Sequence, residues 1–128
     1  MFLSRDEINN IHFFCSIIEL IARETNNHRS DVIERFTLAD IQDELELAEV
    51  NHCLPVERVV DEYINDYGIS EGNFQHVPEF CKVFTYSQIG RILEVYIVAE
   101  VENLGRPLAQ TTKQILSRTL EELFATFD

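Results

Sequence analysis

The helical period of the apolar residues is the feature that most constrains this fold. Between residues 8 and 22 they recur at intervals of three and four, which places them on one face of an α-helix. This stripe consists of Ile8, Ile11, Cys15, Ile18 and Ala22. Ser4 and Glu7 stand before it with the spacing of a capping box. We therefore predict a helix of about 20 residues that begins after Ser4 and is central to the core.

The same period predicts further helices, whose ranges are 30–35, 38–48, 55–67, 86–104 and 108–127. Thr37 and Thr85 stand before two of them, with Asp40 and Gln88 three positions later, so the capping spacing is repeated. Gly68 supplies a left-handed stop after the helix predicted over 55–67. Short connections between long helices favour antiparallel neighbours.

Residues 69–84 have the least regular pattern, and Pro78 excludes a long element there. Residues 80–84 fit a short strand or one helical turn, and we favour an extended loop or a single turn because no partner strand is evident. The helix over 86–104 is rich in β-branched residues, yet this span is too long for a typical strand. The sequence therefore predicts an all-α fold, a single compact domain over residues 1–128 with five or six helices. We expect the first and the last two long helices to form its core.

The charge of the chain is concentrated in one quarter of its length. The whole chain has a formal net charge of −13, from 23 acidic and 10 basic residues. Residues 40–71 hold ten acidic residues and one basic residue, Arg58, which gives this segment a net charge of −9. Residues 1–39 and residues 72–128 have a net charge of −2 each.

Helical geometry predicts where these acids lie. In the two helices of this segment, carboxylates three or four residues apart share a face that points away from the apolar stripes. Each like-charge pair destabilises a helix by about 0.2–0.5 kcal/mol, and the segment has one Arg to relieve it. A solvated face that aids solubility is one interpretation, and a docking surface for a basic protein partner is the other. The candidate docking residues are Asp40, Asp43, Glu44, Glu46, Glu57, Asp61, Glu62 and Asp66.

The net charge argues against anionic partners. Duplex DNA or a membrane surface would repel the chain unless a basic patch overrode the total, and no run of basic residues exists. Residues 110–118 carry Gln, Thr, Lys and Arg side chains that could serve a DNA-recognition helix, but the overall charge opposes this function. No apolar stretch reaches the roughly 20 residues that span a bilayer. The first residues also lack the order of a secretory signal.

The cysteines favour a reducing cytoplasm. A disulfide framework needs an even number of cysteines at high density, whereas this chain has three, Cys15, Cys53 and Cys81. Because each has apolar neighbours, we predict three buried structural thiols. His12 and His52 could complete a Cys2His2 zinc site, but no C-x-x-C pair supports it, so we expect no metal and no cofactor. The sequence contains neither a nucleophile elbow nor a glycine-rich phosphate loop. We therefore expect a protein without enzymatic activity.

The length of 128 residues, the net charge of −13 and the acid-rich helices over 40–49 and 57–66 resemble small acidic bacterial proteins that neutralise toxins. These are the immunity proteins of contact-dependent or polymorphic toxin systems and the antitoxins. They share a role rather than a motif. The resemblance implies a non-enzymatic inhibitor that occludes the cationic surface of a basic toxin domain, such as a nuclease. Two alternatives stay open: a DNA mimic or phage-encoded inhibitor of a nucleic-acid-binding complex, and a general acidic interaction module.

Overall fold

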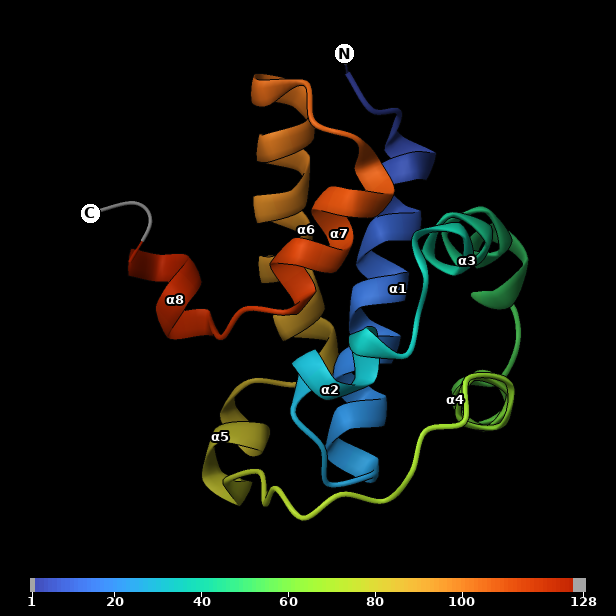
Figure 1. Cartoon of the computed structure of the whole chain (residues 1–128), viewed down its shortest axis with the longest axis vertical. Helices are drawn as coiled ribbons and strands as arrows, with labels where there is room; N and C mark the ends of the chain where they lie inside the picture. Colours follow the sequence, from blue (N-terminus) through green and yellow to red (C-terminus); the bar gives the residue numbers. More distant parts are fainter. Residues whose placement is uncertain (1, 126–128) are drawn as a thin grey trace.

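Helices make up the regular structure of the computed structural model, which describes residues 2–125. This range holds eight helices and no strand (Figure 1). The helices are α1 Arg5–Glu24, α2 Arg29–Glu34, α3 Leu38–Asn51, α4 Val56–Asp66, α5 Pro78–Val83, α6 Tyr86–Leu104, α7 Leu108–Leu116 and α8 Leu120–Ala125. The all-α fold is confirmed. The predicted number of five or six helices is wrong, because α2, α5 and α8, of six residues each, accompany five longer ones.

Capping boxes open three of the long helices where the sequence predicts them. At α1, the Ser4 hydroxyl accepts the N–H of Glu7 at 3.1 Å, and the Glu7 carboxylate accepts the N–H of Ser4 at 2.9 Å. The other two pairs are Thr37 with Asp40 and Thr85 with Gln88. Gly68 follows α4 with a φ of 60°, the left-handed conformation expected of it. These local signals place the starts of α1, α3 and α6 and the end of α4.

α1 is the central helix of the fold, and it packs against α2, α3, α4 and α6. α6 runs antiparallel beside it (Figure 1). Gly90 permits this approach, since a Cβ at residue 90 would lie 2.1 Å from Ser16 Oγ and 2.8 Å from Ser16 N. α7 packs on α6, α3 and α2. The core therefore includes the three predicted helices, α1, α6 and α7, together with the buried faces of α2, α3 and α4.

The last helix, predicted over 108–127, is broken into α7 and α8. A fourth capping box starts α8: Thr119 and Glu122 exchange two hydrogen bonds of 3.1 Å between side chain and backbone. Arg29, from the start of α2, donates to the carbonyl of Leu116 at the end of α7 and to the carbonyl of Arg118 within the break. The predicted continuous helix is thus wrong, and its last residues, 126–128, lie outside the described range.

Residues 69–84 contain a short helix rather than a strand. α5 begins at Pro78, where the missing N–H is no loss, and it buries none of its side chains. The loop before it is tied to the end of α1, because Gly72 N donates to Thr25 O and Phe74 N donates to Asn26 O, both at 2.8 Å. The strand alternative for residues 80–84 is therefore wrong. Among the described helices, none has the length and apolar character needed to cross a membrane.

Candidate functional site

The acid-rich segment forms two neighbouring helices on one side of α1. Both α3 and α4 pack against α1, and both are seen end-on in Figure 1. A hydrogen bond links them, because Tyr67, directly after α4, donates its hydroxyl to the carboxylate of Glu44 on α3 at 2.6 Å. The structure thus brings the acids of both helices to the same side of the molecule.

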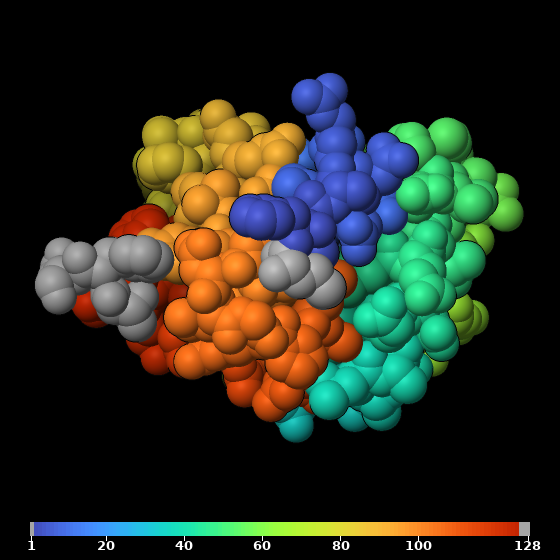
Figure 2. Space-filling model, turned by 90° about the horizontal axis from the view of Figure 1, so that it is seen from above, coloured from blue at the N-terminus to red at the C-terminus, as the bar shows by residue number. Residues whose placement is uncertain are grey.

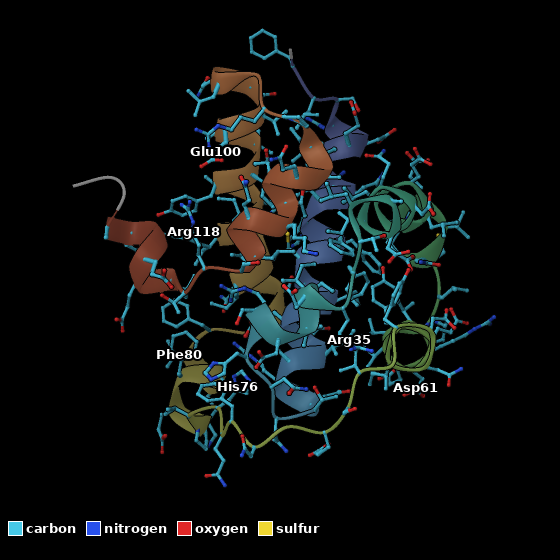
Figure 3. All side chains as sticks on the ribbon, viewed as in Figure 1. Arg35, Asp61, His76, Phe80, Glu100 and Arg118 are labelled. Atoms are coloured by element: carbon cyan, nitrogen blue, oxygen red, sulfur yellow. The ribbon has the colours of Figure 1, made fainter. Side chains whose placement is uncertain are left out.

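Six of the eight candidate docking residues have exposed side chains. They are Asp43, Glu46, Glu57, Asp61, Glu62 and Asp66, which we call the acidic surface. Figure 3 labels Asp61 on α4, and its side chain is exposed. Asp40 is half-buried, and its carboxylate accepts the N–H of Thr37 at 2.9 Å as part of the α3 cap. The carboxylate of Asp40 therefore caps the start of α3.

Glu44 does not belong to the acidic surface, and its prediction as an outward-facing residue is wrong. The residue is 7% exposed, since it lies three positions after Ile41 and four before Ala48 on the buried face of α3. Burial raises the pKa of its carboxyl, and the nearby Asp66 raises it further, while the hydrogen bond from Tyr67 acts in the opposite direction. Glu44 thus joins α3 to the end of α4.

Few cations offset the acidic surface. Arg58 is the one basic residue of the segment, and its Nε lies 3.1 Å from Oε1 of Glu62, with both side chains exposed. Arg35, which follows α2, donates through Nε to the carbonyl of Tyr67 at 3.2 Å. The folded chain therefore brings a second guanidinium to the end of α4, which the charge count along the sequence did not include. Even so, the six carboxylates outnumber the nearby cations.

The side chains that were candidate zinc ligands form contacts within the protein instead of a metal site. Cys15 lies in the core, where burial raises the pKa of its thiol, and this disfavours the thiolate that a metal needs. His12 donates through Nε2 to the carbonyl of Ser87 at 2.9 Å. Within residues 2–125, no group of three or more His, Cys, Asp or Glu side chains is placed to hold a metal ion.

The prediction of three buried thiols is wrong for Cys53. This residue is exposed because it lies in the connection after the end of α3, while Cys81 on α5 is half-buried. His52 donates through Nδ1 to the carbonyl of Ala48 at 3.1 Å, and its Nε2 lies 3.6 Å from the Cys53 sulfur. Of the three cysteines, only Cys15 is a core residue.

Several polar side chains of α7 that could have contacted DNA form contacts inside the protein instead. Thr111 and Thr112 are buried, and Lys113 donates through Nζ to the carbonyl of Phe36 at 2.6 Å. Internal packing and hydrogen bonding thus account for much of the polar set that the sequence offered at this helix.

Comparison with known proteins leaves the acidic surface to be interpreted from its own geometry. No protein-family model, no curated protein and no solved structure matches this chain.

Proposed function

We propose that this protein is a non-enzymatic inhibitor that binds a basic protein partner through the acidic surface of α3 and α4. One observation carries the proposal: six exposed carboxylates lie on two adjacent helices, and one of them pairs with the single arginine of the segment. Like charges three or four residues apart destabilise a helix by about 0.2–0.5 kcal/mol per pair. The positive charge of a cationic partner offsets this repulsion, and its attraction to the carboxylates raises the association rate.

The partner class that fits this surface is a toxin domain with a cationic substrate cleft, such as a nuclease. Lys and Arg side chains that would bind phosphates can pair with carboxylates instead, and charge-assisted hydrogen bonds then hold the complex. Helices present these carboxylates on rigid elements, which suits stoichiometric occlusion of a cleft. In this function the protein is an immunity protein or an antitoxin in a bacterial cytoplasm.

The test uses the protein encoded next to this chain as the candidate toxin domain. Asp43→Lys, Glu46→Lys and Asp61→Lys, combined in one variant, should weaken the complex about 100-fold or more, because both attraction and hydrogen bonds are lost. The matched control combines Glu24→Lys, Glu79→Lys and Glu121→Lys, three exposed acids outside residues 40–71. Both variants change the net charge from −13 to −7. Equal losses in the two variants, measured by calorimetry, would contradict docking through the acidic surface.

Growth assays separate the toxin partner from the DNA-mimic alternative. If the proposed function is right, the neighbouring protein should arrest growth when expressed alone, and coexpression of this chain should restore it. The charge-reversed variant should fail to restore growth, and the control variant should succeed. A harmless neighbour, together with inhibition of a nucleic-acid-binding complex by this chain, would favour the mimic instead.

A further inference from the structure

A pocket of about 630 Å³ opens between α1, the end of α3 and the starts of α4 and α6. Figure 2 shows this part of the molecule, where the blue start of α1 lies between α6 and the green end of α3. Its volume is within the range of about 300–1,000 Å³ that is typical of ligand sites. Glu49 lines the pocket from α3, one helical turn after Glu46 of the acidic surface. The pocket therefore adjoins the acidic surface.

The lining of the pocket is electronegative. Asp6 and Glu49 contribute two carboxylates, and no Lys or Arg is among the described lining residues. The carboxyl end of α3 reaches the pocket at His52, and the last turn of this helix contains no basic residue. The starts of α1, α4 and α6 also reach the pocket and carry the opposite partial charge, so the helix ends add no net negative charge to it. The formal charges of the two carboxylates exceed these partial charges and favour a positively charged ligand.

The remaining lining suits a cation with a long apolar stem. Phe13, Val56 and Tyr86 supply apolar and aromatic surface, against which methylene groups can pack. An aromatic ring also attracts a guanidinium or ammonium group that lies over its face. Asn9 and Asn10 add amide oxygens that can accept hydrogen bonds from such a group.

The histidines of the pocket are fixed by backbone carbonyls. His12 donates to Ser87 O at 2.9 Å through Nε2, and His52 donates to Ala48 O at 3.1 Å through Nδ1. These hydrogen bonds fix the orientation of both rings in the lining.

We infer that this pocket receives an arginine or lysine side chain of the basic partner and anchors the complex that the acidic surface attracts. The inference rests on the proposed function for the source of the side chain. The cation preference itself rests on the pocket, through its two carboxylates and its apolar lining. A buried arginine surrounded by weaker contacts is a common form of binding hot spot.

The experiment titrates the full chain with N-acetyl-argininamide and follows backbone amide resonances by NMR. Chemical-shift changes should be concentrated at Asn9, Glu49 and Ser87. N-acetyl-citrullinamide has nearly the same shape without the charge, and it should bind about tenfold more weakly or worse, since hydrogen bonds to charged groups are the stronger ones. Equal binding of the two probes would overturn the cation preference.

Paired variants locate the binding. Asp6→Asn combined with Glu49→Gln should weaken argininamide binding about tenfold, because it removes both carboxylates from the lining. Glu24→Gln combined with Glu79→Gln is the matched control, which removes two exposed charges outside both the lining and the acidic surface and should leave the affinity within about twofold. Asn9→Arg provides a second approach, since a tethered guanidinium at this exposed position should compete with the probe. Equal weakening by the control variant would overturn the pocket.

The outcomes distinguish this inference from the proposed function. Shifts spread evenly over the acidic surface would overturn the pocket and leave the proposed function standing. Shifts confined to the pocket, in a chain that does not bind its basic neighbour, would remove the partner as the source of the cation. Spermine is the third probe, and binding of spermine more than about 100-fold tighter than argininamide would identify a free polyamine as the ligand instead.

Discussion

Acidic side chains of α1 and of the helices α3 and α4 differ in burial and in their pairing with basic residues. Glu19 on α1 is 5% exposed, and its two carboxylate oxygens lie 3.0 Å from Arg23 Nε and 3.0 Å from Arg29 Nη1. The acidic surface has six exposed carboxylates, and of these six only Glu62 forms an ion pair with another described residue. A buried charge without a partner is costly, whereas an exposed one is not.

This difference separates charges that hold the fold from charges that are available to a partner. Arg29 also donates to the carbonyls of Leu116 and Arg118, so the Glu19 network joins α1, α2 and the turn after α7. Among the residues that the structure describes, no comparable network covers the acidic surface. Glu44 has features of both groups, because it belongs to the acidic segment and yet is buried and hydrogen-bonded to Tyr67.

The largest expected effect comes from breaking the Glu19 network. Arg29→Ala leaves Glu19 with one partner and removes two bonds to carbonyls, so the free energy of unfolding should fall by about 3–5 kcal/mol. Arg58→Ala, at the exposed pair with Glu62, should cost about 0–1 kcal/mol. Urea denaturation followed by circular dichroism measures both. Similar losses for the two variants would contradict the distinction between the two regions.

An intermediate effect is expected at Glu44 and depends on pH. Because its folded pKa is raised above the ordinary value of 4.5, the folded state binds this proton more tightly than the unfolded state does. Stability from Glu44 is therefore present below its unfolded pKa and is lost as pH rises through its folded pKa. Glu44→Gln removes this loss, so the variant should lose less stability than the wild type as pH rises above 4.5.

Asp43→Asn is the control for this pH profile, since Asp43 is the exposed neighbour of Glu44 on the same helix. Its profile of unfolding free energy against pH should follow that of the wild type. If Glu44→Gln also follows the wild type, the buried carboxyl does not contribute to the pH dependence.

The smallest effect is expected at the acidic surface, where the change should increase stability. Added salt screens the repulsion between exposed carboxylates, so the free energy of unfolding of the wild type should rise by about 0.5–1 kcal/mol at high ionic strength. The variant with Asp43→Lys, Glu46→Lys and Asp61→Lys should gain less from salt and should be no less stable than the wild type at low salt. A large loss of stability in this variant would mean that these side chains hold the fold.

Local patterns in the sequence predict most of the helices. They also contain the signals for two features that were not predicted. Thr119 and Glu122 have the same spacing as the three capping pairs that were recognised, so the start of α8 could have been predicted. Glu44 falls on the apolar face defined by Ile41, Leu45 and Ala48, and the 3.6-residue period places it inside. In both cases the signal was present within one or two helical turns.

Other features depend on residues that are far apart in the chain. The turn between α7 and α8 is held by Arg29, and nothing between residues 108 and 119 predicts this contact. Likewise, the pocket combines Asp6 on α1, Glu49 on α3 and Tyr86 on α6, which come together only when the helices pack.

The sequence by itself determined the all-α fold, the starts of the capped long helices and the concentration of charge in residues 40–71. These follow from apolar periodicity, capping pairs and composition, which act within a few residues along the chain. The tertiary structure decided which acids face solvent, which one is buried and where a pocket adjoins them. The physical reason is that burial and electrostatic pairing depend on distances in space, and packing against α1 sets those distances for side chains from four different helices.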